Sequence, residues 1–142
     1  MKVCVFGAGN MGARIAEVFL THDHDVTLVD IKNQFLEGGV KRIDGALSFL
    51  VKQEKMTEER KTALLSGLKT SVDRNVAKDA DFVIEVILEN MDLKKELLRE
   101  LDTICPAHAI FASNTSALSI TEMAAVIPHR SDKFIGCHFF NP

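Results

Sequence analysis

The stretch KVCVFGAGNMG, residues 2–12, decides the fold of this chain. Residues 2–6 form a short, mostly apolar run of the kind that makes a buried strand. After a glycine-rich turn, apolar side chains recur at the spacing of one helical face, at Met11, Ile15, Val18 and Phe19. The stretch therefore predicts a strand, a tight turn and a helix at the start of the domain.

The turn has the pattern G-x-G-x-x-G over residues 7–12, and each position needs glycine for a different physical reason. Gly7 permits the tight turn, Gly9 lets the backbone approach a pyrophosphate, and Gly12 lets the helix pack closely on the strand. We expect the backbone N–H groups that open the helix, at Asn10 and Met11, to face the phosphate charge without help from a basic side chain. The pattern predicts a dinucleotide-binding loop; a glycine-rich turn without function is the alternative.

Asp30 supplies the second half of this pattern, because it ends the next predicted strand, residues 26–30, at roughly the 20-residue spacing of a dinucleotide site. A carboxylate there accepts hydrogen bonds from the adenine ribose hydroxyls. It also repels the 2′-phosphate of NADP, and no arginine follows it closely. NAD is therefore the predicted cofactor. Two alternatives are a flavin dinucleotide, which uses the same fingerprint, and an aspartate that only caps the next helix.

The rest of the chain alternates short strand patterns with longer helical ones, which is typical of βαβ units. We predict one α/β domain over residues 1–142, a Rossmann-type, doubly wound and mostly parallel sheet with helices on both faces. Further strands are expected at 69–72, 82–87, 109–112 and 134–140. Helices are expected at 36–51, from Thr57 to Gly67, at 93–104, and from the capping box at Ser119 to Pro128.

Bulk properties exclude several other classes. A net charge of -3 and a pI near 5.9 do not suit a nucleic-acid-binding domain. No apolar run reaches the roughly 20 residues of a membrane span, and the chain enters a strand pattern at once, without a separate signal peptide. Three cysteines without C-x-x-C spacing predict neither a disulfide framework nor a metal site. We expect a cytoplasmic protein with no metal, nucleic-acid or membrane partner.

Three later segments narrow the function. SNTS at residues 113–116, GCHFFNP at 136–142 and FVIEVILEN at 82–90 resemble the NAD-binding domain of the L-3-hydroxyacyl-CoA dehydrogenase family, in particular 3-hydroxybutyryl-CoA dehydrogenases. The resemblance implies hydride transfer between NAD and the 3-hydroxyl or 3-keto carbon of an acyl-CoA. Related gulonate dehydrogenases share the pattern, so the exact substrate stays open.

The resemblance also assigns roles to single residues. It makes His138 the catalytic base, and an imidazole suits the role because it exchanges a proton near neutral pH. Ser116 would contact the substrate oxygen, and Asn114 would lie beside the nicotinamide. Glu89 and Lys94 match positions that contact the cofactor ribose and the cofactor or CoA phosphates. The alternatives are a histidine that fills a strand end, local turn hydrogen bonds, and solvated charges.

Other polar residues are given structural roles. Glu85 lies inside an otherwise apolar strand pattern and is expected to be structural rather than catalytic. His22, His24, His108 and His129 lack the context of His138 and are expected on the surface or in loops. Ala46 stands where some relatives carry a serine that contacts CoA.

The resemblance also implies that the complete enzyme needs a second region beyond this domain. Family members continue past the HFFNP motif into the rest of the sheet and then a helical domain, which supplies dimer contacts and part of the acyl-CoA cleft. The acidic partner of the catalytic histidine lies about a dozen residues after it in these relatives, beyond Pro142. We therefore expect this chain alone to bind NAD with little or no turnover. Apolar surface around Phe134, Ile135, Phe139 and Phe140 would then favour self-association or a complementing helical domain. The alternatives are a stand-alone NAD-binding or redox-sensing module without catalysis, and a β-hydroxyacid dehydrogenase with a lysine base.

Overall fold

The computed structural model describes residues 1–140 and contains one six-stranded sheet in the order β3-β2-β1-β4-β5-β6. The strands are β1 (Lys2–Phe6), β2 (Asp25–Val29), β3 (Lys69–Ser71), β4 (Phe82–Glu85), β5 (Ile110–Ser113) and β6 (Phe134–Gly136). Every neighbouring pair is parallel. The predicted fold is therefore confirmed as a doubly wound α/β sheet.

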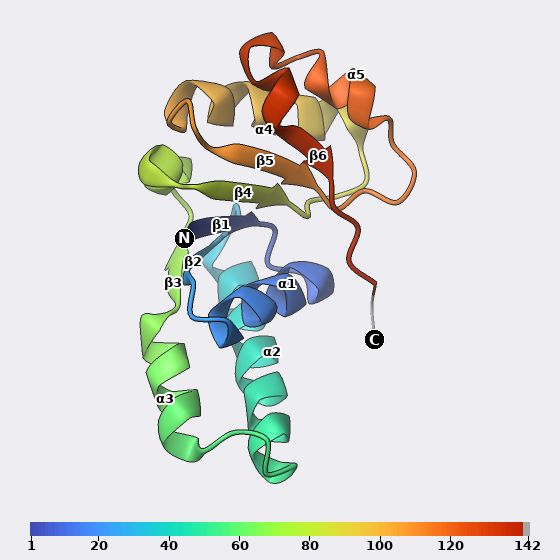
Figure 1. Cartoon of the computed structure of the whole chain (residues 1–142). Helices are drawn as coiled ribbons and strands as arrows, with labels where there is room; N and C mark the ends of the chain where they lie inside the picture. Colours follow the sequence, from blue (N-terminus) through green and yellow to red (C-terminus); the bar gives the residue numbers. More distant parts are fainter. Residues whose placement is uncertain (141–142) are drawn as a thin grey trace.

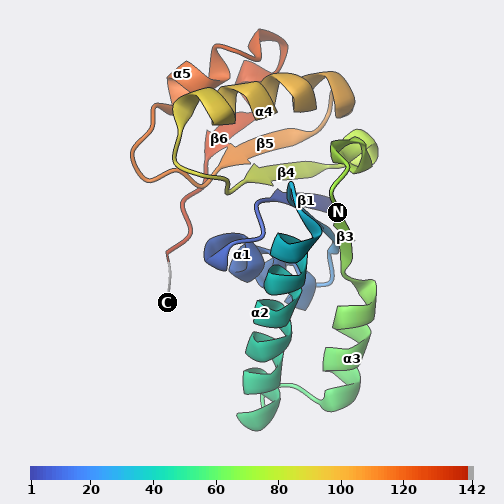
Figure 2. The ribbon, with the colours of Figure 1, turned by 180° about the vertical axis from the view of Figure 1, so that it is seen from behind.

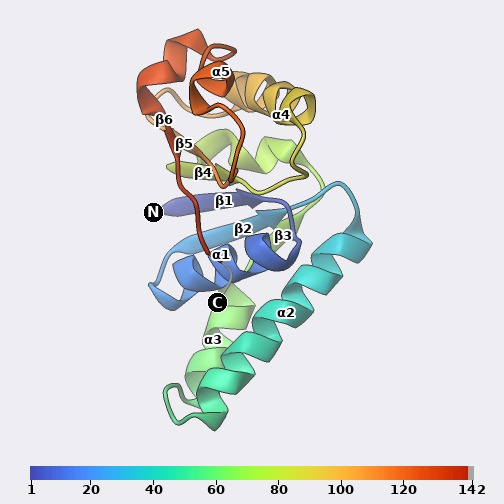
Figure 3. The ribbon, with the colours of Figure 1, turned by 90° about the vertical axis from the view of Figure 1, so that its right-hand side faces the viewer.

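Helices cover both faces of the sheet (Figures 1 and 2). The first face carries α1 (Asn10–Thr21) and α2 (Asn33–Lys52), and the second carries α4 (Met91–Ile104) and α5 (Ile120–Ala124). The remaining helix, α3 (Glu58–Gly67), pairs with α2 in a hairpin that extends beyond the sheet (Figure 3). Two 3-10 helices, η1 (Arg74–Asp79) and η2 (Pro128–Lys133), precede β4 and β6.

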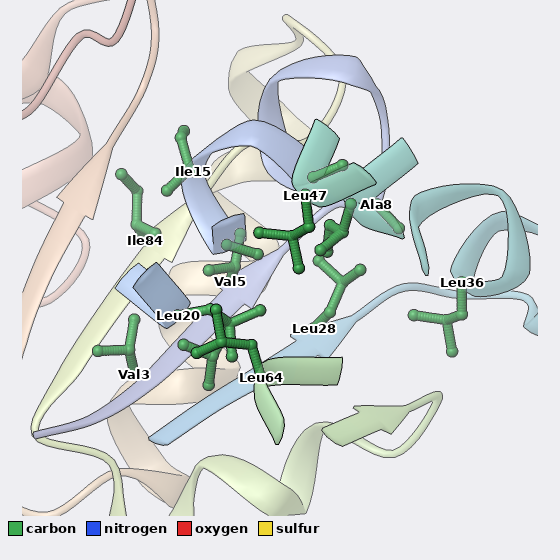
Figure 4. Close-up of a cluster of buried hydrophobic side chains, with 14 of the residues drawn as sticks. Val3, Val5, Ala8, Ile15, Leu20, Leu28, Leu36, Leu47, Leu64 and Ile84 are labelled. Atoms are coloured by element: carbon green, nitrogen blue, oxygen red, sulfur yellow. The ribbon is translucent and has the colours of Figure 1, made fainter. Parts of the chain in front are cut away.

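Strand alternation divides the core into two clusters. In β1, Val3 and Val5 face α1 and α2, whereas Cys4 and Phe6 face α4, because successive side chains of a strand point to opposite faces. Figure 4 shows the first cluster, where Val5 lies among the apolar side chains of α1 and α2. The central strands are buried on both faces, and this explains their continuous apolar runs.

Two predicted strands are shorter in the structure by at least two residues. β4 ends at Glu85 rather than residue 87, because the amide of Ile87 turns toward the Glu85 carboxylate. β6 ends at Gly136 rather than residue 140. Beyond it the amide of Phe139 donates to the side chain of Asn114 instead of a neighbouring strand. This segment crosses to the α1 side of the sheet, where Cys137 and Phe139 pack on the first core cluster (Figure 1).

Other boundaries show what patterns of apolar spacing miss. Helix α2 begins at Asn33, three residues before the predicted start, despite its paired glycines. A Cβ on Gly39 would lie 3.1 Å from the carbonyl oxygen of Ala8, so this glycine lets α2 approach the loop closely. The predicted caps at Thr57 and Ser119 are confirmed, since each side chain accepts a hydrogen bond from the backbone amide three residues later.

Within residues 1–140, no helix combines the length and apolarity needed to cross a membrane.

Candidate functional site

The site lies at the carboxyl ends of the parallel strands, where ligands bind in open α/β sheets. The strand order places β1 between β2 and β4. The loop of residues 7–12 follows β1, Asp30 follows β2, Glu89 lies beyond β4, Ser116 beyond β5 and His138 beyond β6. Because all strands run in one direction, the fold collects at one edge residues that are far apart in sequence.

The three glycines of the loop face different constraints. Gly7 has φ +110°, and a Cβ there would lie 2.6 Å from the carbonyl oxygen of Val86. A Cβ on Gly12 would lie 1.7 Å from the carbonyl oxygen of Gly7. At Gly9 a Cβ would meet no described atom within 4 Å. The fold therefore demands Gly7 and Gly12, whereas the openness at Gly9 leaves space next to the backbone for a bound group.

Helix α1 presents its N-terminus at this loop. Gly9 is the N-cap and provides no side-chain hydrogen bond to the helix, and the first turn carries no acidic residue. Asn10 is exposed and Met11 is half-buried. The amides of the first turn and the positive end of the helix dipole thus suit a phosphate group.

Asp30 is bound to the loop itself. Its Oδ2 accepts a 2.6 Å hydrogen bond from the amide of Ala8, and its Oδ1 accepts a 2.7 Å hydrogen bond from the amide of Ile31. An ionised carboxylate has about four acceptor positions, so two remain for a ligand. Asp30 also lines a pocket at this edge of the sheet. In this position its carboxylate can accept hydrogen bonds from the hydroxyl groups of a ribose.

That pocket has a volume of about 580 Å³ and extends from the glycine loop to helices α2 and α4. Phe35, Leu88 and Leu93 are among the apolar residues that line it. Arg42 of α2 and Arg74 of η1 also line it, and Arg74 is paired with Glu100. Neither arginine directly follows Asp30 in the sequence, because the fold brings them to the pocket from separate elements.

Ser116 and His138 form a hydrogen-bonded pair. Ser116 Oγ lies 2.9 Å from Nε2 of His138, and both residues are exposed. The His138 ring makes an edge contact with Phe140, with 4.7 Å between ring centroids. Asn114 Oδ1 accepts a 2.7 Å hydrogen bond from the amide of Phe139 and so holds the segment that carries His138.

Glu89 is attached to the same turn. Its Oε1 accepts hydrogen bonds from the Thr115 hydroxyl and from the amide of Ser116, the latter at 3.2 Å. Its Oε2 lies 3.4 Å from Nζ of Lys94. Desolvation favours the neutral acid, but the Thr115 hydroxyl and the Lys94 charge outweigh it and lower the pKa of Glu89.

Lys94 is not a solvated charge. Its side chain is 1% exposed, and its Nζ lies 2.9 and 2.7 Å from the two oxygens of the fully buried Glu85 carboxylate. Glu85 also accepts hydrogen bonds from the Ser113 hydroxyl and the amide of Ile87. Its polar contacts agree with the structural role expected for it. The predicted contact between Lys94 and a cofactor or CoA phosphate stays a prediction.

Sequence reasoning did not identify Ser113 and Thr115 as members of the site. The only signals for this network were the acidic Glu85 inside an apolar strand and the polar SNTS segment at the end of β5. The other histidines have no part in it: His22, His108 and His129 are exposed, and His24 is half-buried.

Comparison with known proteins identifies the family. The family model for "3-hydroxyacyl-CoA dehydrogenase, NAD binding domain" matches residues 2–142. The chain belongs to this family. Members of the 3-hydroxyacyl-CoA dehydrogenase family are oxidoreductases, and the matched domain binds NAD. The glycine loop, the bare N-terminus of α1 and Asp30 fit that cofactor, so the NAD prediction agrees with both the family and the donor set.

Similar proteins are longer than this chain. It is 44% identical to the mitochondrial hydroxyacyl-coenzyme A dehydrogenase of Rattus norvegicus, over 99% of this chain and 46% of that protein. It is 37% identical to a glyoxysomal fatty acid beta-oxidation multifunctional protein of Brassica napus, over 99% of this chain and 19% of that protein. The (S)-3-hydroxybutyryl-CoA dehydrogenase structure from Ralstonia eutropha matches with a TM-score of 0.95 and 42% identity. The match covers 99% of this chain and 50% of that one. The chain spans about half the length of the rat and Ralstonia relatives and about a fifth of the Brassica protein.

Proposed function

We propose that this chain is the cofactor-binding half of an NAD-dependent dehydrogenase that interconverts 3-hydroxyacyl-CoA and 3-ketoacyl-CoA. The observation that carries the proposal is the 2.9 Å contact between Ser116 Oγ and Nε2 of His138. A base and a hydroxyl meet there at the same edge of the sheet as the dinucleotide loop. Relatives named for 3-hydroxyacyl-CoA chemistry, including fatty acid beta-oxidation, support this substrate class.

The cofactor would be held by the loop of residues 7–12 and by Asp30. Gly7, Gly9 and Gly12 let the backbone approach the pyrophosphate, and the amides at Asn10 and Met11 open the helix beneath it. The free acceptor positions of Asp30 would bind the adenine ribose. Glu89 and Asn114 lie nearer the Ser116–His138 pair, where the nicotinamide end would be placed.

Oxidation of the alcohol removes one hydride and one proton. When bound, NAD supplies the hydride acceptor. His138 would take the hydroxyl proton at Nε2 as the carbon–oxygen bond becomes a carbonyl, and would return it in the reverse reaction. Ser116 would donate a hydrogen bond from Oγ to the substrate oxygen, because its hydroxyl is exposed beside the same imidazole nitrogen.

The acyl-CoA cleft is proposed to require a second domain. Ser116 and His138 are both exposed, and Phe140 is 82% exposed beside them. An active site that excludes water strengthens its electrostatic interactions, so a complementing helical domain would close this one. Without such a domain, we propose that residues 1–142 bind NAD with little or no turnover. Phe134, which was expected on this apolar surface, is instead buried in the second core cluster at 7% exposure. The exposed Ile135 on edge strand β6 still supports self-association as a second use of this surface.

Calorimetry and a complementation assay test the proposal. The chain is titrated with NAD, NADP and acetoacetyl-CoA, and NADH production from 3-hydroxybutyryl-CoA is followed with and without a helical domain from a relative. We expect NAD binding, weaker NADP binding and activity only after complementation. Activity of the chain alone would refute the requirement for a second domain. NAD binding without rescue by any helical domain would instead favour a non-catalytic NAD-binding or redox-sensing module.

The oligomeric state and the cellular location are tested separately. Sedimentation equilibrium over a range of concentrations separates a monomer from a homo-oligomer. The cytoplasmic location stays a prediction, since the relatives include a mitochondrial and a glyoxysomal protein.

A further inference from the structure

We infer that the buried Glu85–Lys94 ion pair is a positioning unit that sets the orientation of Ser116 toward His138. This inference rests on the proposed function, in which Ser116 and His138 act on the substrate oxygen. Neither Glu85 nor Lys94 touches the substrate in this scheme, because both side chains are at most 1% exposed. They act through the residues that connect them to the turn at 113–116.

The ion pair is an unusual feature to bury. Taking two charges out of water is costly, and a buried ion pair is often no more stabilising than apolar residues of similar size. Here the pair connects three elements: Glu85 ends β4, Lys94 belongs to α4, and Ser113, which donates to Glu85, ends β5. Stability alone therefore does not account for it, whereas fixing the relative positions of these three elements does.

Two routes lead from Glu85 to the turn that carries Ser116. Along the first, the Ser113 hydroxyl donates to Glu85, and its oxygen accepts a 3.2 Å hydrogen bond from the amide of Thr115. Along the second, Lys94 joins Glu85 to Glu89. Glu89 then accepts from the Thr115 hydroxyl and from the Ser116 amide.

Both routes end on the backbone next to Ser116. A polar residue on an exposed turn otherwise samples several conformations, and misplacement of a reacting group by about 1 Å costs up to about a hundredfold in rate. The two routes restrict the backbone of Thr115 and Ser116, and so direct Oγ of Ser116 at the imidazole. Asn114 restrains the opposite partner by holding the amide of Phe139.

The test replaces the pair by neutral groups of similar shape, as the double variant E85Q/K94M, which leaves no lone buried charge. The matched control is D102N/R130M, which removes another largely buried ion pair from a different part of the α4 region. Hydrogen exchange of the Thr115 and Ser116 amides and the side-chain ¹⁵N shifts of His138 are measured by NMR in both variants, together with NAD affinity. kcat and KM are measured in the complemented enzyme.

In E85Q/K94M we expect exchange of the Thr115 and Ser116 amides to accelerate at least about tenfold beyond any change in global stability. The His138 ¹⁵N shifts should move as its contact with Ser116 loosens. kcat should fall about ten- to a hundredfold, by a larger factor than the affinity for NAD falls. The control should leave both amides and His138 unchanged, once global stability is subtracted.

Unchanged amide exchange, His138 shifts and kcat in E85Q/K94M would overturn the inference. If that variant does not fold, S113A removes one route alone and must accelerate exchange of the Thr115 amide for the inference to stand. The NMR results do not depend on turnover. An inactive wild-type complemented enzyme therefore counts against the proposed function, whereas unperturbed amides in the variant count against the positioning role.

Discussion

The backbone amide of Ala8 donates a 2.6 Å hydrogen bond to Oδ2 of Asp30. The two residues follow adjacent parallel strands, so the bond ties the glycine loop to the end of β2. Asp30 therefore has two functions in the proposed site: it holds the loop in place and it offers its remaining acceptor positions to a ribose. A carboxylate suits both functions, because it has about four acceptor positions.

Substitution of Asp30 should alter cofactor choice. In Asp30→Ser we expect NAD affinity to fall about ten- to a hundredfold, because hydrogen bonds to a charged group are worth about 1.5–3 kcal/mol. NADP affinity should fall less or rise, since the charge that repels its 2′-phosphate is gone. Calorimetric titration of both cofactors checks this, with the exposed Asp132→Ser as control. An unchanged ratio of NAD to NADP affinity would argue that Asp30 only holds the loop.

The loop glycines should separate binding from folding. Gly9→Ala adds a methyl group where no described atom lies within 4 Å, and Gly9 has the ordinary φ of -68°. We expect an unchanged melting temperature but at least about tenfold weaker NAD binding, because the methyl group faces the pyrophosphate.

Gly12→Ala is the matched comparison. Its Cβ would lie 1.7 Å from the carbonyl oxygen of Gly7, so the backbone must shift. We expect a loss of about 3 kcal/mol or more in the free energy of unfolding, measured by urea denaturation. Equal loss of NAD binding and of stability in both variants would remove the distinction between the two glycines.

The three thiols should differ in reactivity. Burial raises the pKa of Cys4 to about 12 and that of Cys105 to about 11, whereas Cys137 is only half-buried. The thiolate is the reactive form, so a raised pKa suppresses reaction of Cys4 and Cys105 at pH 8. We expect an aromatic disulfide reagent to label one thiol in the native protein, and the other two only after unfolding. Cys137→Ser should abolish the native-state reaction; native labelling that persists in this variant would contradict the assignment.

Arg130 should be a major contributor to stability. It lies 4% exposed over the Phe111 ring, pairs with Asp102 at 2.8 Å, and donates to the carbonyl oxygens that follow α4. In Arg130→Met we expect a loss of about 3 kcal/mol in the free energy of unfolding, because a partly buried carboxylate and several carbonyls lose their donor. The substitution Arg99→Met, at an exposed position of α4, the helix that carries Asp102, should change the free energy of unfolding by less than about 0.5 kcal/mol. Similar small effects in both variants would refute the role of Arg130.

Local chemistry predicted much of the fold. The strand, glycine turn and helix at residues 2–21, the caps at Thr57 and Ser119, and the parallel sheet follow from spacing and residue type, which act within a few residues. The ends of β4 and β6 did not follow, because they depend on where amides find acceptors. Ile87 turns to a buried carboxylate and Phe139 to the side chain of Asn114, and neither partner belongs to the strand's own pattern.

The amino-acid sequence by itself determined the α/β class, the dinucleotide loop, the acid after β2 and the family resemblance, since these depend on near neighbours and fixed spacing. Only the tertiary structure decided that Ser116 meets His138, that Lys94 is buried against Glu85, and that Arg42 and Arg74 share a pocket with Asp30. Those contacts join residues from different elements. Their formation depends on how parallel strands align at one edge of the sheet, and no local pattern encodes that alignment.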